Sequence, residues 1–364
     1  MSIEKARSSH VLVRPTINGQ DVGPFILDTG ASGLVISSAA AEKLNLRAFG
    51  EVFVSGVSGK VPCRFRRADA LTLGPITVEQ PVFMEMDVEG IVTGASEPVA
   101  GIVGFDAFKS SVLEVGPGGS PVRLYDPATF VAPASWTWHP LLMVSNVPHV
   151  AANFAGAPGC GPQIFMIDSG AGGADCIFHA RAVKELGLRR LLPPVQEGKP
   201  RASSKVRGVG GSSGESSGAT KAYRGTLEWL HLCTELPGAD EGGVGYDFAA
   251  GVGSGMKVAK AVAAGSIDDG DDCAWDGGGG GGGGGGGNGT DAEYAAGQAE
   301  GGKFAALNVL LASDAGFDLS EHSCGLICAN ALNTRRVIYD LPNRRMALLL
   351  DGVDEPVPST QMFS

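Results

Sequence analysis

The chain has 364 residues, 43% of them hydrophobic, which is enough for one large or two medium domains with a sizeable core. Its formal net charge of −11 argues against nucleic acid and anionic membranes as partners. No apolar run approaches the roughly 20 residues that a membrane helix needs, and the first residues lack the apolar core of a signal peptide.

Cysteine usage points to a compartment. The seven cysteines are an odd number and show no framework spacing. They therefore fit a reducing compartment better than a secreted disulfide scaffold. We expect an intracellular, cytoplasmic protein, with a plastid or another organelle as the alternative if a transit segment has been removed.

The first strongly patterned segment is 25–36, where Asp-Thr-Gly-Ala-Ser-Gly, beginning at Asp28, stands between two apolar runs. This pattern predicts a buried strand, a tight turn at Gly30 and a second buried strand. An aspartate at the end of such a strand points away from water, where an unpaired charge is costly. A short alanine-rich helix is expected next, within 36–46.

A hairpin is predicted over 51–62, which consists of a strand, a glycine turn and a second strand. Gly56 and Gly59 would give this hairpin the mobility that a lid needs. An ordinary hairpin without a lid function is the alternative.

The first half of the chain ends in a compact apolar motif. Ile102 and Val103 are followed by Gly104, whose missing Cβ would let two backbones touch. A helical turn and closing strands are expected over 105–125.

The second half repeats the first. Segment 163–173 again places an acidic residue, Asp168, after an apolar run and before a hydroxyl residue and glycine. A second helix is expected within 178–188, and segments 324–332 and 336–348 echo the end of the first half. Such an internal repeat indicates two related structural units.

Prolines and a tryptophan pair mark the segment 126–138 as the link between these units. We therefore expect two domains, 9–130 and 131–352.

The second domain is longer because of a tract rich in Gly, Ser and Ala, at about 210–302, which includes the unbroken glycine run 277–287. This tract cannot bury enough apolar surface to offset its ordering entropy, so we expect a largely disordered insertion. Residues 227–232 are the expected ordered strand within it. Residues 207–211 stand where a second lid hairpin would be.

The two Asp-[Ser/Thr]-Gly turns resemble the active-site loops of aspartic proteases, and the short halves are most similar to retropepsin-like enzymes. The resemblance implies a mainly β fold of two pseudo-symmetric, retropepsin-like (acid protease) β-barrel lobes with a central cleft and one catalytic aspartate per lobe. By position the hairpin 51–62 resembles the flap, although it lacks the flap tyrosine of pepsin-like enzymes. The residues carried over from the family are catalytic Asp28 and Asp168; loop-supporting Thr29, Gly30, Ser32, Ser169 and Gly170; flap Gly56, Val57, Ser58 and Gly59; and Ψ-loop Ile102, Val103, Gly104, Leu326, Ile327 and Cys328.

Two positions depart from the family pattern. Gly172 replaces the hydroxyl residue that Ser32 provides in the first turn, and this hydroxyl is expected to support its aspartate. Because the loss of a hydrogen bond disfavours the charged form, we predict that Asp168 is the more easily protonated of the two aspartates. Cys328 stands where glycine is usual, which puts the close packing of the second lobe in doubt.

The resemblance implies an aspartic endopeptidase in which the Asp28/Asp168 dyad activates a water. The expected substrate is a peptide or unfolded protein, and the expected state is a monomer without cofactor or metal. A zinc site at His322, Cys324 and Cys328 is the weaker interpretation, because no fourth ligand has matching spacing. The alternatives are a catalytically silent peptide-binding protein, suggested by Gly172 and Cys328, and a homodimer that uses one lobe.

Overall fold

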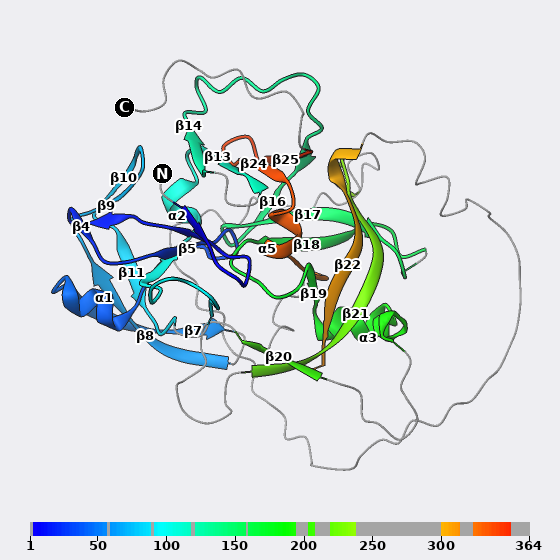
Figure 1. Ribbon diagram of the computed structural model, residues 1–364, viewed down its shortest axis with the longest axis horizontal. Coiled ribbons are helices and arrows are strands. Elements are labelled where there is room, and N and C mark those ends of the chain that lie inside the picture. Colours follow the sequence, from blue (N-terminus) through cyan, green and yellow to red (C-terminus); the bar gives the residue numbers. More distant parts are fainter. Residues whose placement is uncertain are drawn as a thin grey trace, which may run out of the picture. The chain divides into compact units, whose positions relative to one another are not determined.

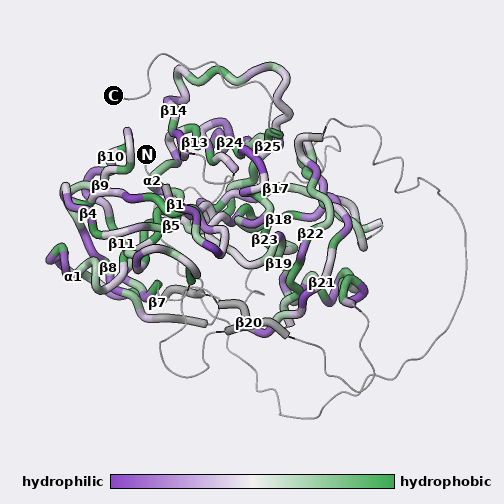
Figure 2. Tube along the Cα trace, viewed as in Figure 1, coloured by the Kyte–Doolittle hydropathy of each residue, from purple (hydrophilic) through white to green (hydrophobic). Residues whose placement is uncertain are grey.

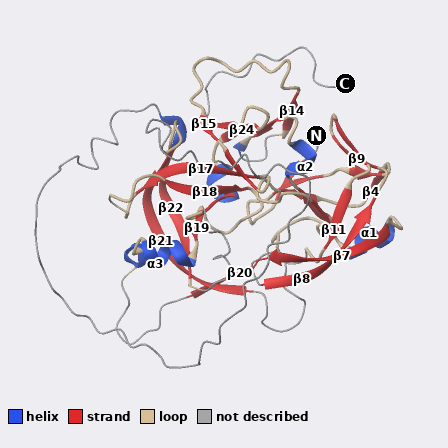
Figure 3. Ribbon diagram, turned by 180° about the vertical axis from the view of Figure 1, so that it is seen from behind, coloured by secondary structure: helices blue, strands red, loops and turns tan. Residues whose placement is uncertain are grey.

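The computed structural model describes residues 3–56, 59–88, 91–117, 121–157, 159–193, 203–207, 219–237, 300–313 and 323–350. The chain divides into one compact unit, Met1–Tyr246 with Gly301–Ser364, and a second unit, Asp247–Glu300. The architecture below is that of the first unit. It is built mainly of strands, with few and short helices (Figure 3), which confirms the predicted β fold.

An eight-stranded sheet, here called the N-terminal sheet, holds most of the first half of the chain (Figure 1). Its strands in spatial order are β1 (Ile3–Lys5), β2 (Val11–Val13), β5 (Phe25–Leu27), β12 (Gly101–Val103), β6 (Leu34–Ile36), β11 (Val82–Glu85), β8 (Gly59–Arg67) and β7 (Arg47–Gly56). Strand β1 precedes residue 9, where the first domain was expected to begin.

A second eight-stranded sheet, the C-terminal sheet, repeats this order strand for strand. Its order is β16 (Leu142–Val144), β17 (Val147–Phe154), β18 (Gln163–Asp168), β23 (Gly325–Cys328), β19 (Cys176–Phe178), β22 (Lys303–Ala312), β21 (Ala219–Leu232) and β20 (Ser203–Arg207). Each equivalent pair also runs in the same relative direction: β5–β12 and β18–β23 are parallel, whereas β12–β6 and β23–β19 are antiparallel. The repeat seen in the sequence is therefore a repeat of topology.

A five-stranded sheet joins the two halves. Its order is β14 (Arg123–Tyr125), β13 (Val112–Val115), β24 (Arg336–Asp340), β25 (Arg345–Leu349) and β15 (His139–Pro140). The central pair, β13 and β24, is antiparallel and places Leu113 opposite Tyr339. A small sheet with the order β10 (Ile76–Glu79), β9 (Ala70–Leu73), β3 (Thr16–Ile17) and β4 (Gln20–Asp21) completes the strands of the described residues.

The helices are short and equivalent in the two halves. They are α1 (Ser38–Lys43), α2 (Phe105–Phe108), α3 (Ala180–Glu185) and α5 (Ala329–Leu332), with 3-10 turns η2 (Leu188–Leu191) and η4 (Glu300–Gly302). The predicted helices after the two acidic turns are confirmed as α1 and α3. The Ser37 hydroxyl accepts a hydrogen bond from the N–H of Ala40 and caps α1. Within the described residues, no helix combines the length and apolarity needed to cross a bilayer.

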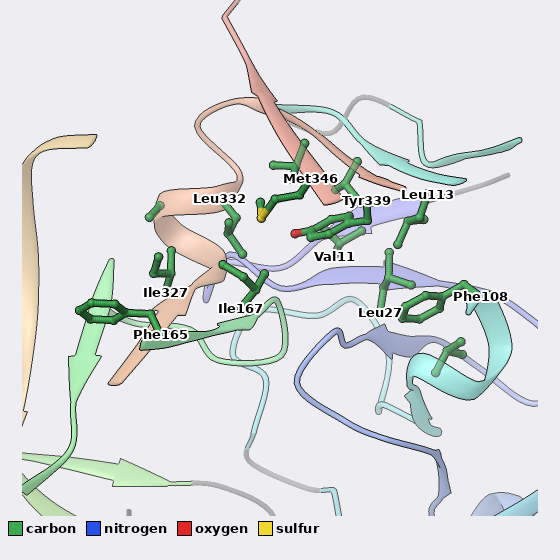
Figure 4. Packing of buried hydrophobic residues seen from close by; sticks show 14 of the residues in the cluster. Val11, Leu27, Phe108, Leu113, Phe165, Ile167, Ile327, Leu332, Tyr339 and Met346 are labelled. Atoms are coloured by element: carbon green, nitrogen blue, oxygen red, sulfur yellow. The ribbon is translucent and has the colours of Figure 1, made fainter. Parts of the chain in front are cut away.

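One hydrophobic core runs through both halves. Leu27 and Ile167, the residues before the two aspartates, belong to it together with Tyr339 and Met346 of the joining sheet (Figure 4). Both hydrophilic and hydrophobic residues occur along β21 and β22 (Figure 2), and the end of β22, residues 309–312, is buried throughout. The core thus fixes the ends of β5 and β18, which carry the acidic turns.

The expected insertion is only partly described. The strand predicted at 227–232 is confirmed as part of the longer β21, Ala219–Leu232. Residues 208–218 and 238–299 lie outside the described residues, as does the glycine run.

Candidate active site

Asp28 follows β5 and Asp168 ends β18, so the two aspartates occupy equivalent positions in the two large sheets. Each of these strands lies between an antiparallel and a parallel neighbour, so both aspartates come at the end of a central strand. We call residues 28–33 the first acidic loop and residues 168–173 the second acidic loop.

Four reciprocal hydrogen bonds join the two loops through Thr29 and Ser169. The N–H of Thr29 donates to Ser169 Oγ at 2.9 Å, and the N–H of Ser169 donates to Thr29 Oγ1 at 3.0 Å. Each hydroxyl in turn donates to a carbonyl of the opposite half, Thr29 to Ile167 and Ser169 to Leu27, both at 2.8 Å. All four bonds are buried, so they hold the loops in one relative position.

This arrangement brings the carboxyl groups of Asp28 and Asp168 into hydrogen-bond contact with each other. The N–H of Gly30 donates to Asp28 Oδ1 at 2.7 Å, and the N–H of Gly170 donates to Asp168 Oδ1 at 2.9 Å. A Cβ on Gly30 would lie 2.6 Å from Cγ of Asp168, and a Cβ on Gly170 would overlap the Asp28 carboxyl group. Only glycine at both positions lets the carboxyl groups approach this closely.

The protein environment raises the pKa of the two aspartates to different extents. Burial raises the pKa of Asp28, while hydrogen bonds from the N–H of Gly30 and from Asp168 lower it. Burial and then the charge of Asp28 raise the pKa of Asp168 well above its usual range. These shifts favour the protonated form of Asp168, and the pair titrates as a unit. The direction agrees with the expectation that Asp168 is more easily protonated, but the leading causes are burial and the neighbouring charge.

The structure does not bring Ser32 to the aspartate that it was expected to support. Ser32 is exposed, and among the described residues no hydrogen bond joins it to Asp28. Gly172, its counterpart in the second acidic loop, is packed against the N-terminal segment of the chain. A Cβ there would overlap the carbonyl oxygen of Ser8 and lie 2.7 Å from Cε1 of His10.

The predicted Ψ-loop residues form β12 and β23 and the positions that follow. Ile102 and Val103 pair with β5, and Leu326 and Ile327 pair with β18. Gly104 fits the expectation of close contact, because a Cβ on it would overlap the carbonyl oxygen of Gly33.

Cys328 occupies the equivalent of Gly104, and its side chain is fully buried. Val35 and Ile177 are equivalent in register, opposite Ile102 and Leu326 respectively. The segment from Asp168 to Ile177 is therefore two residues longer than the segment from Asp28 to Val35. The Cys328 side chain packs in a cluster of buried residues that includes Ala174 of the longer loop and Ile177, so the second half accommodates a side chain at this position.

The predicted flap is the hairpin of β7 and β8, in which Gly56 pairs with Gly59. Val57 and Ser58 lie outside the described residues. The hairpin of β20 and β21 has the same place in the C-terminal sheet, where a second flap was expected near residue 207. The function of both hairpins as lids stays a prediction.

The zinc interpretation gains no support from the thiols. Cys324 and Cys328 are buried, and burial raises the pKa of Cys324 to about 12 and that of Cys328 well above its usual range. A thiol must lose its proton to bind zinc, which these surroundings oppose. His322 lies outside the described residues.

Sequence reasoning missed His10. It directly precedes the apolar strand β2, and no local pattern distinguishes it from a surface histidine. In the structure its side chain is buried and its Nε2 lies 2.8 Å from the carbonyl oxygen of Gly170, 160 residues away.

The described residues thus bring two carboxyl groups together at the meeting of two equivalent glycine turns. Residues 13–107, which include the first acidic loop, the β7–β8 hairpin and β12, match the family model described as aspartyl protease. This match supports a retropepsin-like aspartyl protease and an aspartic-type hydrolase. The comparison with curated proteins finds no match for the chain.

Proposed function

We propose that this protein is an aspartic endopeptidase with two retropepsin-like lobes, in which Asp28 and Asp168 form the catalytic dyad. The observation that carries the proposal is the hydrogen bond between the two carboxyl groups, which requires them to share one proton. The family match of the first half supports the same assignment.

The mechanism uses both protonation states. Ionised Asp28 takes a proton from a water molecule, whose oxygen attacks the carbonyl carbon of the scissile peptide bond. Protonated Asp168 gives its proton to the carbonyl oxygen, so a neutral tetrahedral diol forms. The proton now on Asp28 passes to the leaving nitrogen as the C–N bond breaks, and a diol hydroxyl returns a proton to Asp168. The dyad thus ends in its starting state.

The substrate would be an extended peptide or unfolded protein bound through its backbone. The β7–β8 hairpin, with Gly56 and Gly59 at its end, would act as the flap. Because both aspartates belong to one chain, a monomer suffices. We propose a cytoplasmic location from the cysteine content, with a plastid or another organelle as the alternative.

Hydrolysis of a denatured, dye-labelled protein substrate tests the proposal over acidic to neutral pH. We expect cleavage by the wild type and loss of at least about 10³-fold in kcat for Asp28→Asn and for Asp168→Asn. Asp69→Asn is the matched control, since Asp69 is exposed and distant in sequence from both loops. Wild-type protein that binds the substrate but does not cleave it would favour the silent binding protein instead. Full activity of Asp168→Asn would favour a homodimer that uses only the first lobe.

A further inference from the structure

The turn between β1 and β2, residues 6–10, contacts the second acidic loop. It is closed by hydrogen bonds from the N–H of Ala6 to the carbonyl of His10, at 3.0 Å, and from the N–H of Ser9 to the carbonyl of Ala6, at 2.9 Å. The side chain of Asn333, which follows α5, donates to the carbonyl of Ser9. The first half of the chain thus reaches across to the second half at this turn.

The imidazole of His10 is held at both nitrogens. Nε2 lies 2.8 Å from the carbonyl oxygen of Gly170, and Nδ1 lies 2.8 Å from the hydroxyl of Ser8. Because a carbonyl oxygen only accepts, Nε2 carries the hydrogen. Burial lowers the pKa of His10, so the neutral ring is favoured and its Nδ1 accepts from the Ser8 hydroxyl.

The accepting carbonyl belongs to Gly170, whose own N–H donates to Asp168 Oδ1 at 2.9 Å. The Gly170 C=O and the Ala171 N–H are the two ends of one planar amide. The Ala171 N–H also faces Asp168: it donates to the main-chain carbonyl oxygen at 3.4 Å, and it lowers the pKa of the carboxyl group. A hydrogen bond to the C=O end polarises the amide and strengthens the N–H end as a donor.

The same histidine fills the space beside Gly172. Since a Cβ at this position would overlap the Ser8 carbonyl and approach His10 Cε1 to 2.7 Å, the loop has no room for a side chain there. The first acidic loop has Ser32 at the corresponding place, and that residue is exposed. The two loops are therefore supported differently.

We propose that His10 is a positioning residue of the acid pair: its hydrogen bond to the carbonyl of Gly170 holds this residue, whose own N–H donates to Asp168 Oδ1. His10 thus packs beside Gly172, where the second acidic loop has no side chain. The inference rests on the proposed function for its catalytic consequence, whereas its geometric part concerns the carboxyl pair alone.

The test compares His10→Leu, which keeps much of the volume but removes the donor, with His10→Gln, whose Nε2 can donate to the same carbonyl. Loss of the donor makes the Asp168 carboxylate harder to form. We therefore expect His10→Leu to lower kcat about 10-fold with little change in KM and to move the alkaline limb of the pH–rate profile to higher pH. His10→Gln should restore both quantities towards wild type. Equal impairment of the two variants, or a profile unchanged in His10→Leu, would overturn the proposal.

A second readout does not depend on activity. In protein labelled with ¹³C at aspartate carboxyl carbons, the higher apparent pKa of the pair should rise in His10→Leu and stay in place in His10→Gln. If the wild type cleaves nothing, the proposed function fails while this titration still decides the role of His10. Should His10→Leu not fold, His10→Met, which also lacks the donor but is more adaptable in packing, replaces it; an unshifted titration there would count against the proposal.

Discussion

Thr29 and Ser169, 140 residues apart, each accept the other's backbone N–H with a side-chain oxygen, at distances of 2.9 and 3.0 Å. Their hydroxyl hydrogens are also used, because each donates to a carbonyl of the opposite half. Each hydroxyl thus accepts one hydrogen bond and donates another, so the orientation of both side chains is fixed where the two acidic loops meet. These reciprocal hydrogen bonds explain how two aspartates from distant segments of the chain come to lie beside each other.

Thr29→Val tests this connection. Valine keeps the shape of the side chain but removes its oxygen, leaving the N–H of Ser169 and the carbonyl of Ile167 buried without their partner. We expect a loss of about 1–3 kcal/mol in the free energy of unfolding, together with a lower kcat. Urea denaturation measures the first quantity. Thr77→Val, at an exposed position of β10, is the matched control and should change stability by less than about 0.5 kcal/mol.

Asp168→Asn should change how stability depends on pH. The folded-state pKa of Asp168 lies above its unfolded value, so the native protein binds more protons than the unfolded chain between these two values. Its contribution to stability is therefore complete at low pH and is lost as pH rises through the folded-state pKa. Thermal unfolding should show that Asp168→Asn is more stable than wild type at neutral pH, with the difference shrinking in acid. If Asp168→Asn were less stable than wild type at neutral pH, this would contradict the raised folded-state pKa of Asp168.

Gly172→Ser should not add a supporting hydroxyl to the second acidic loop. Its Cβ would overlap the carbonyl oxygen of Ser8, so the turn at 6–10 must move. We expect a loss of about 1–3 kcal/mol from overpacking and reduced activity. Gly33→Ala is the comparison, since a Cβ there meets nothing closer than 3.7 Å. Gly172→Ser with unchanged stability and higher kcat would show that the N-terminal turn does not fill this space.

Gly104 and Cys328 occupy equivalent positions but should respond in opposite ways to a change of size. A Cβ on Gly104 would overlap the Gly33 carbonyl, so Gly104→Ala is expected to destabilise by about 1–3 kcal/mol. Cys328→Gly removes a fully buried side chain and should destabilise by about 1–2 kcal/mol through the cavity that it leaves. Chemical denaturation measures the free energy of unfolding of both variants and so tests the two predictions. Stabilisation by Cys328→Gly would mean that the longer second loop does not accommodate the thiol.

The two features that suggested a silent binding protein, Gly172 and Cys328, both have a structural explanation. The first faces the N-terminal turn, and the second packs in a cluster of buried residues that includes Ala174 and Ile177. Neither feature disturbs the hydrogen bond between the carboxyl groups. The structure therefore offers no observation that favours the silent protein over the hydrolase.

Much of the local structure could be predicted because its causes lie within a few residues. Apolar runs before Asp28 and Asp168 predict buried strands, and the glycines that follow predict tight turns. The same reasoning correctly placed α1 and α3 and the strand within 219–232. It could not predict the full length of β21. The first residues of this strand, from Ala219 on, are extended because they pair with β20 and β22, and their own sequence does not predict a strand.

By itself, the sequence determined the duplication: two acidic turns of the same chemistry, each between apolar runs, each followed by a short helix. Only the tertiary structure decided that Thr29 meets Ser169, that the two carboxyl groups come together, and that His10 contacts the second acidic loop. The physical reason is the distance along the chain over which each interaction acts. Hydrophobic period and turn chemistry act between neighbours in the chain, whereas the bond from His10 to the carbonyl of Gly170 spans 160 residues and exists only once both sheets are packed.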